Sequence, residues 1–575
     1  MKLIIGIGGT GIRAAHTALH LLASDVYKSK EVKEVVHFIA LDKDTNNGNA
    51  QDAGETHAYF QGASAFVPQL ASHTFKWKDI KLDDKEGGYL RSLAGQGVGP
   101  GEKKMPEKLN RRFKETNDPL LLNWLFSTED QEASLEDGFK QKPAIGALYF
   151  ETVRENFCVD ALYPIFGSLQ TNEQLHVFLY GSLFGGTGAA LIYQVAKCIR
   201  DTSKLPRYNF PERVCIGGAM MLPYFMLPLL DKDEFERRKR DNKFRLQTKD
   251  LIPIAQTALA SYNAMDINEL VRTKENEAEA GQGNVVFDAL YPLGLYPQCN
   301  NISDSDEGVR NTDNLAATTK NYQSGGGQQK GRPTLVDLLA AQAMCHFFSM
   351  ADTHRPSKPT GDLLLPGEVA TSNLFITRFS NDCELNSIGW GNLPDGEVLR
   401  RQLLVMLKFS LYITTYLAPR YELAKKKEKT EYTAYLDRDY AKGRNGKNLE
   451  IAGKALESVF HYAVRFMEFL LTVATTNNGS VGNLACALLD TDNLKLAIDG
   501  VKAFYDEDKR PSQAPEYYSD LAKPFNRDNS GLCNPTENGP LETNAEAQAQ
   551  GYDGETIFNL VSKQKQAAAQ LYPAI

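Results

Sequence analysis

The sequence predicts an α/β fold built on a doubly wound, mostly parallel sheet. Two segments support this prediction, because each runs from an apolar strand through a glycine-rich turn into a helix. The first opens the chain at 1–22, and the second covers 175–200. A further apolar run at 35–41 ends in acidic residues and supplies another parallel strand. This order of elements is the first half of a nucleotide-binding sheet.

The two glycine-rich turns are the candidate phosphate site. Glycine lets the backbone approach a phosphate without a Cβ in the way, and a helix N-terminus favours negative charge. A single glycine turn is equally compatible with a tight bend, but two turns fit the two ends of one polyphosphate. The candidates in the two turns are Gly8, Gly9, Thr10, Gly11 and Arg13, and then Ser182, Gly185, Gly186, Thr187 and Gly188.

Asp42, at the end of the strand 35–41, is also a candidate site residue. In a dinucleotide enzyme such an acid holds a ribose hydroxyl, so an NAD-binding oxidoreductase is an alternative. That alternative needs only one pyrophosphate loop and leaves the second glycine turn unexplained.

These motifs resemble, in order, the nucleotide loops of the tubulin/FtsZ superfamily. The residues that carry the resemblance are Ile5-Gly6-Ile7-Gly8-Gly9-Thr10-Gly11, Phe38-Ile39-Ala40-Leu41-Asp42 and Gly185-Gly186-Thr187-Gly188, the last similar to the signature GGGTGSG. The segment 142–147 and the helix expected to follow it to residue 157 resemble the FtsZ loop and helix before the signature strand, which adds Pro143 to the site. The resemblance covers roughly residues 1–350 and is greatest to divergent bacterial tubulin-like proteins.

The sequence departs from the signature at three places. Phe184 stands where the first glycine is expected, and Ala189-Ala190 replace the final Ser/Thr-Gly pair. Arg13 stands where FtsZ carries a polar amide, and it either reaches a phosphate or points into solvent. The departures are compatible with nucleotide binding and leave the rate of hydrolysis open.

The resemblance also implies residues that read the base and activate water. Asn300 lies where the superfamily reads the guanine edge, although asparagine is an ordinary turn residue. Asp337 lies one turn into the predicted central helix, where an acid can accept from guanine N1–H and N2–H₂ or simply stabilise the helix start. The catalytic acid is implied to come from the next subunit, with Asp362 favoured over Asp352, and either is alternatively a solvated loop acid.

The resemblance and composition together divide the chain into four parts. Residues 1–332 form the nucleotide-binding domain, with an insertion at 46–138 that crosses the top of the sheet. A central helix at 333–351 joins it to an α+β C-terminal domain at 352–507. The polar tail 508–575 ends in a helix that could dock on a protein partner or a neighbouring subunit. Further strands are expected at 214–222, 284–295 and 372–379, and further helices at 252–263, 397–417 and 451–473.

Composition excludes several classes of function. The net charge of -8 argues against nucleic-acid binding, which usually needs a basic face. The eight cysteines show no CxxC spacing, so we expect mostly buried thiols in a cytoplasmic protein, with no metal site and no disulfide framework. The apolar stretch 403–417 is too short to span a bilayer comfortably, so a buried helix is favoured and no transmembrane segment is expected.

Two main functions remain from the sequence. In the first, the protein binds GTP or GDP with Mg²⁺, hydrolyses GTP and self-assembles head-to-tail into filaments. In the second, it is a nucleotide-binding scaffold in a heteromeric complex with little or no hydrolysis. The oxidoreductase is a distant third.

Overall fold

The computed structural model describes the N-terminal half of the chain and parts of the rest. The described residues are 1–27, 34–44, 47–66, 70–82, 139, 142–171, 173–210, 213–223, 233, 236–237, 248–264, 286–293, 335–353, parts of 399–413, and 458–470. The strand expected at 372–379 and the tail 508–575 lie outside the described residues.

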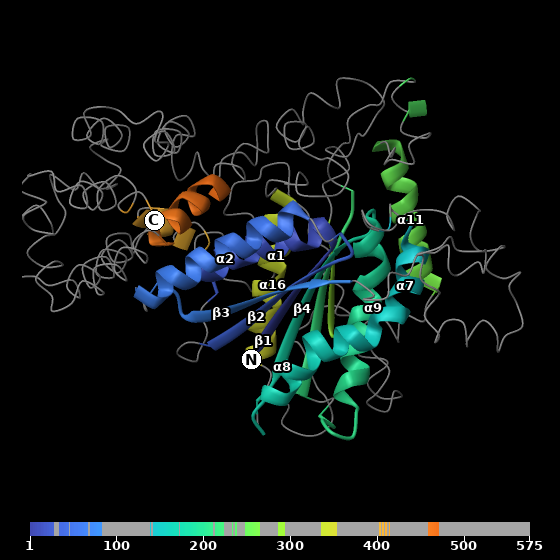
Figure 1. Ribbon diagram of the computed structural model, residues 1–575, viewed down its shortest axis with the longest axis horizontal. Coiled ribbons are helices and arrows are strands. Elements are labelled where there is room, and N and C mark those ends of the chain that lie inside the picture. Colours follow the sequence, from blue (N-terminus) through green and yellow to red (C-terminus); the bar gives the residue numbers. More distant parts are fainter. Residues whose placement is uncertain are drawn as a thin grey trace, which may run out of the picture.

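A six-stranded parallel sheet forms the centre of the molecule (Figure 1). Its strand order is β3-β2-β1-β4-β5-β6, so the order reverses between β1 and β4. All five neighbouring pairs are parallel, which confirms the predicted doubly wound sheet. The strands are β1 (Lys2–Ile7), β2 (Glu34–Asp42), β3 (His73–Lys81), β4 (Leu175–Ser182), β5 (Val214–Met221) and β6 (Ala289–Leu293).

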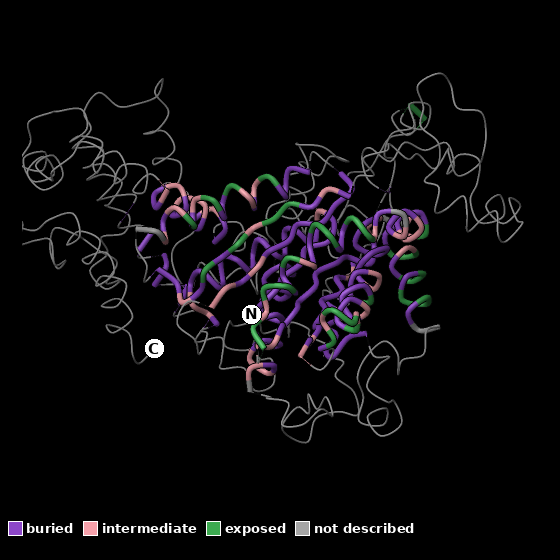
Figure 2. The backbone as a smooth tube through the Cα atoms, turned by 60° about the horizontal axis from the view of Figure 1, so that its bottom comes forward, coloured by how far each residue is buried: buried purple, intermediate pink, exposed green. Residues whose placement is uncertain are grey.

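Helices cover both faces of the sheet, which explains why β1 and β4 are almost wholly apolar. One face carries α1 (Gly8–Ala23), α2 (Gly48–Phe66) and α16 (Leu335–Thr353). The other carries α7 (Pro143–Phe157), the π-helical turn η1 (Cys158–Leu162), α8 (Tyr163–Ser168), α9 (Gly186–Ser203) and α11 (Thr248–Ala264). Buried residues form one large core through the middle of the described part of the molecule, together with a small second cluster of Ile12, Ala40, Ala50 and Ala53 (Figure 2).

The core on the α16 face is rich in aromatic rings. Phe178 of β4 packs against two rings of α16. Its ring centroid lies 5.6 Å from that of Phe347 and 6.4 Å from that of Phe348. Its neighbour across the sheet, Gly217 of β5, has no room for a side chain, because an added Cβ would lie 2.8 Å from both Phe178 and Phe347. The central helix predicted at 333–351 is therefore seated directly on the sheet.

The segment after β2 differs from the prediction. Residues 46–138 were expected to be an insertion crossing the top of the sheet, yet α2 covers the sheet and β3 pairs in parallel with β2 along nine residues, from Glu34–His73 to Asp42–Lys81. The prediction is wrong for this part because β3 alternates buried and exposed side chains, as an edge strand does, and lacks a continuous apolar run. The remainder, 83–138, lies outside the described residues.

A C-terminal helical segment at 458–470 packs against α1 and α2 (orange in Figure 1). The ring of Phe469 stacks on His20 of α1 with centroids 4.7 Å apart. Arg465 forms ion pairs with Asp52 and Glu55 of α2. The described residues of 399–413 are also helical and buried in the same core. Parts of the chain far beyond the sheet in sequence thus complete its α1–α2 layer.

Helix α1 lies unusually close to the strands because of its glycines. A Cβ added to Gly11 would lie 2.4 Å from the carbonyl oxygen of Tyr180 on β4. A Cβ added to Gly6 of β1 would lie 2.7 Å from the carbonyl oxygen of Gly11. Both clashes are with backbone atoms, which cannot move aside as a side chain can. Gly11 therefore serves helix–sheet packing, besides any role toward a ligand.

We predict that Gly11→Ala destabilises the protein by about 2 kcal/mol or more, because the new methyl group overpacks a backbone contact. Thermal unfolding followed by circular dichroism measures the effect. The matched control is Gly167→Ala in α8, where no atom lies within 4 Å of the added Cβ. That control should be neutral or slightly stabilising. Equal melting temperatures for the two variants would contradict the proposed packing role.

Candidate functional site

The two glycine turns lie side by side at the carboxyl ends of β1 and β4. Gly8 has a φ of +71°, a conformation that side chains rarely adopt. A Cβ at Gly8 would lie 3.2 Å from both the backbone nitrogen of Gly188 and the Cβ of Thr187. The turns meet where the strand order reverses, which is where open α/β sheets bind their ligands. One ligand can therefore contact both turns.

Both turns lead directly into helix N-termini. Helix α1 begins at Gly8 and α9 at Gly186, and among the described residues neither start has a side-chain cap or an acid in its first turn. Gly9, Gly185 and Gly186 are partly exposed, whereas Thr10, Gly11, Thr187 and Gly188 are buried. The first N–H groups of an α-helix have no partner within it, and its dipole is positive there. This pair of helix starts is suited to an anion such as a phosphate chain.

Asp42 joins the end of β2 to the second glycine turn. Its buried carboxylate accepts hydrogen bonds from the Lys43 backbone N–H at 2.8 Å, the Asn47 side-chain amide at 2.5 Å and the Thr187 hydroxyl at 2.9 Å. Burial raises the pKa of Asp42, and these hydrogen bonds offset part of the rise. The Thr187 hydroxyl expected at a phosphate thus binds Asp42 in this structure.

Asn47 was not among the predicted site residues. It is buried, donates to Asp42 with its side chain, and accepts from the backbone N–H of Asn49 at 2.9 Å. The available signal was the polar run 42–47 directly after a buried strand. Nothing in that run distinguishes the residue that turns back onto Asp42 from its polar neighbours.

A third helix start lies at the same edge. Pro143 is the first residue of α7, where its missing N–H costs nothing. A Cβ added to Gly146 would lie 2.6 Å from the Cβ of Ala190 in α9, so these helices pack closely. The α9 residue in this contact is Ala190, which stands where the signature has its last glycine. One turn on, the Tyr149 hydroxyl donates to the Leu82 carbonyl beyond β3.

Arg13 and Asp337 form a buried ion pair next to the glycine turns. Arg13 is in the second turn of α1 and is 4% exposed, and Asp337 is in the first turn of α16 and is 0% exposed. The Arg13 Nε lies 2.9 Å from an Asp337 carboxylate oxygen. The prediction that Arg13 could point into solvent is therefore wrong. The Asp337 carboxylate, which was expected to bind guanine, is neutralised by Arg13 in this structure.

Comparison with known families finds a tubulin-like match for the N-terminal part of the chain. The family model described as tubulin like matches residues 3–246, which contain both glycine turns, Asp42 and Pro143. Residues 3–246 are tubulin-like. No curated protein and no solved structure matches it.

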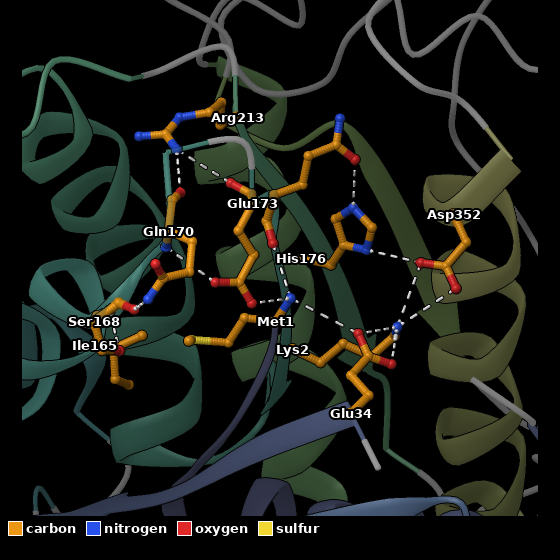
Figure 3. A network of polar contacts seen from close by, with 11 residues as sticks. Met1, Lys2, Glu34, Ile165, Ser168, Gln170, Glu173, His176, Arg213 and Asp352 are labelled. Atoms are coloured by element: carbon orange, nitrogen blue, oxygen red, sulfur yellow. Dashed lines mark hydrogen bonds and ion pairs between the residues drawn. The ribbon is translucent and has the colours of Figure 1, made fainter. Parts of the chain in front are cut away.

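In this tubulin-like protein, Asp352 lies at the opposite edge of the sheet from the glycine turns. It is near the end of α16, and Figure 3 shows it beside the amino ends of the strands. Lys2 Nζ lies 3.3 Å from the Asp352 carboxylate and 2.6 Å from that of Glu34. His176 Nδ1 lies 3.2 Å from the Asp352 carboxylate, and the Tyr27 hydroxyl donates a hydrogen bond to the same carboxylate. One subunit alone does not bring Asp352 to the glycine turns.

The surroundings of Asp352 keep it ionised. Burial alone would raise the pKa of Asp352, but the contact with His176, the charge of Lys2 and the Tyr27 hydroxyl hold the pKa well below its ordinary value. Burial lowers the pKa of His176, although its contact with Asp352 acts in the opposite direction. At neutral pH this end of the tubulin-like domain therefore holds a fixed carboxylate among structural partners.

Most of the predicted site residues lie at one edge of the sheet, and two of them fall outside the described part of the chain. Asn300 and Asp362 lie outside the described residues. Within the described part of the chain, no group of three or more His, Cys, Asp or Glu residues could hold a metal ion, and no helix is long and apolar enough to cross a membrane. The predicted residues found at the carboxyl edge are Gly8, Gly9, Thr10, Gly11, Arg13, Asp42, Pro143, Ser182, Gly185, Gly186, Thr187, Gly188 and Asp337.

We predict that Arg13→Met costs about 3–5 kcal/mol of stability, because it leaves the Asp337 carboxylate buried without its partner. The double variant Arg13→Met with Asp337→Leu should recover a large part of this loss, since it removes both charges. Chemical denaturation of the two single variants and the double variant gives the coupling energy. Additive losses in the double variant would show that the two residues act independently.

Proposed function

We propose that this tubulin-like protein binds a guanine nucleotide at the carboxyl edge of the sheet, with the phosphates between the starts of α1 and α9. The observation that carries the proposal is the direct contact of the two glycine turns at the point where the strand order reverses. Two helix N-termini whose first turns hold no acid neutralise a polyphosphate better than one. The tubulin-like family match supports the same ligand class.

The exposure of the glycines supports a backbone cradle for the phosphates. Gly9, Gly185 and Gly186 are the partly exposed members of the two turns, so their backbone is accessible to a ligand. Thr187 and Asp42 lie behind them and hold the second turn to β2. Mg²⁺ in this arrangement would be bound by phosphate oxygens and water, as is usual when a protein has no dedicated oxygen cage.

The Arg13–Asp337 pair supports guanine as the base. Guanine presents N1–H and N2–H₂ donors next to the O6 acceptor, and its N7 is a second acceptor. A carboxylate can accept from guanine N1–H and N2–H₂, while a guanidinium beside it can donate to O6. Adenine presents an N6–H₂ donor where guanine has O6, so it would place a donor against the guanidinium. Base recognition by this pair requires it to become accessible when the nucleotide binds.

The two ends of α16 support head-to-tail assembly with hydrolysis. The helix has 19 residues and is therefore about 28 Å long. Asp337 in its first turn lies beside the glycine turns, and Asp352 near its end lies at the amino edge of the sheet. In a head-to-tail pair, the amino edge of one subunit faces the carboxyl edge of the next. Asp352 would then approach the nucleotide of the neighbouring subunit, and Asp362 follows it by ten residues in the sequence.

One observation favours a second function, a nucleotide-binding scaffold with little turnover. The Asp352 carboxylate is already bound by Lys2, His176 and Tyr27, so its use on an incoming water would cost those contacts. Arg13, close to the turns, is likewise committed to Asp337. This function keeps the nucleotide as a structural ligand and places activity in a heteromeric assembly.

We predict that Gly186→Asp weakens GTP binding at least tenfold, because a carboxylate at the start of α9 repels the phosphates. The same carboxylate should leave folding intact, since an acid is favourable at a helix N-terminus. Isothermal titration calorimetry with GTP measures the affinity, and thermal unfolding checks the fold. Gly167→Asp in α8 is the matched control, with the same change of charge at an exposed position. An unchanged affinity in Gly186→Asp would refute the proposed phosphate site.

Assembly and turnover are tested separately from binding. We predict that the protein sediments as filaments with GTP but not with GDP, and that phosphate release per subunit rises steeply with protein concentration. Asp362→Ala should abolish phosphate release while leaving GTP binding unchanged. A protein that binds GTP tightly, stays monomeric at high concentration and releases no phosphate would support the scaffold and exclude the filament. The nucleotide released on denaturation of the purified protein identifies the base.

A further inference from the structure

Two cysteines that are far apart in sequence meet on the α7–α9 face of the sheet. Cys158 opens the π-helical turn η1, and Cys198 lies in the second half of α9. Their Sγ atoms are 3.2 Å apart, although 40 residues separate them. A disulfide has a sulfur–sulfur distance of about 2.05 Å, so bond formation requires an approach of roughly 1 Å. The two thiols are therefore already in contact within the folded protein.

The surroundings make the two thiols unequal. A hydrogen bond from Cys198 lowers the pKa of the Cys158 thiol to about 7, even though burial acts against this, while the pKa of Cys198 is raised. The Thr202 hydroxyl lies 3.9 Å from the Cys158 sulfur, whereas the charge of Arg154 lowers the pKa of both thiols and does not distinguish them. Cys158 is thus the more readily ionised thiol of the pair, and Cys198 is the less readily ionised one.

Cys158 is close to the protein surface. It is 7% exposed and Cys198 is 1% exposed. The next residue in η1, Val159, is 52% exposed and is among the few large apolar side chains on the surface of the described chain. Single π-helical turns are rare and occur often at functional sites. This turn brings Cys158 within reach of a small oxidant, whereas Cys198 is almost fully buried.

We propose that Cys158 and Cys198 are a peroxide-sensitive thiol pair that forms a reversible disulfide between η1 and α9. In the first step, the Cys158 thiolate attacks one oxygen of hydrogen peroxide, the O–O bond breaks, and a sulfenic acid and hydroxide form. In the second step, Cys198 attacks the Cys158 sulfur, the S–O bond breaks, and water leaves. Two thiols and one peroxide thus yield one disulfide and two waters. A thiol reductant reverses the reaction.

The geometry favours this pair over a metal site or a purely structural contact. Within the described residues no third His, Cys, Asp or Glu joins the two sulfurs to bind a metal. A disulfide would fix the end of α7 and η1 to the second half of α9. Both helices start at the carboxyl edge of the sheet, where Gly146 of α7 packs against Ala190 of α9. The crosslink therefore ties the far ends of two helices that are already packed at their starts. The proposal does not depend on nucleotide binding.

The direct test uses the full-length, fully reduced protein and hydrogen peroxide. Differential alkylation followed by mass spectrometry should show that two of the eight cysteines lose reactivity. The protein mass should fall by about 2 Da, as expected for one disulfide. A non-reduced digest should contain one peptide pair joined through Cys158 and Cys198, which dithiothreitol separates. If both residues remain alkylated after oxidation, or if Cys158 couples to a different cysteine, the proposal is wrong.

Two variants test the order of the steps. Cys198→Ser removes the resolving thiol, so Cys158 should accumulate as a sulfenic acid that dimedone traps. Cys158→Ser should leave Cys198 unreactive toward peroxide. Cys215→Ser, at a half-buried cysteine in β5, is the control and should form the crosslink as the unmodified protein does. Dimedone labelling at Cys198 in Cys158→Ser to the same extent as at Cys158 in Cys198→Ser would overturn the assigned order.

Thermal unfolding gives a readout that needs no variant. Closing a loop of 40 residues should raise the melting temperature of the oxidised protein by roughly 5 °C relative to the reduced protein. The rise should disappear after reduction and should be absent in Cys158→Ser. An oxidised protein that carries the crosslink but melts at or below the temperature of the reduced protein would show that the bond strains the α7–α9 layer and does not lock it.

Discussion

The close approach of α1 and α9 to the sheet, and of their starts to each other, is the constraint on which the rest of this structure depends. Strands β1 and β4 are neighbours, so the helices that follow them start side by side. The approach is possible only because Gly11 lies against a backbone carbonyl of β4 and Gly188 lies against the backbone of Ser182. These glycines bring two positive helix ends together without bringing side chains between them. The proposed anion site is therefore a consequence of packing.

Ion pairs connect α16 to the strand–helix unit β1–α1. Arg13 joins α1 to the start of α16, and Lys2 joins β1 to the end of the same helix. Helix α16 is thus held to the first strand–helix unit at both edges of the sheet, with an aromatic layer between. A change at the glycine turns that moves α1 would act on α16 through Arg13. This gives a physical connection between the two edges that a head-to-tail assembly would bring together.

The elements that could be predicted are those whose signal is local. The glycine turns, the strands β1, β2, β4 and β5, and the helices α7, α9, α11 and α16 each carry their own apolar pattern or turn residues, and the structure has them at the predicted places. The edge strand β3 was missed because half of its side chains face outward, so its pattern is polar. The partners of Asp42 and Arg13 were missed for another reason. Asn47 is one of several polar residues in a row, and Asp337 lies 324 residues from Arg13.

The sequence by itself determined most of the sheet, the tubulin-like resemblance and the two glycine turns, because glycine spacing and strand periodicity are properties of short segments. Only the tertiary structure decided which charges meet. It paired Arg13 with Asp337, held Asp352 among Lys2, His176 and Tyr27, and brought Cys158 against Cys198. Such pairs form between segments distant in the chain, and their energies depend on burial and on separations of a few ångströms. No local pattern encodes those distances, so they appear only when the sheet and its helices are assembled.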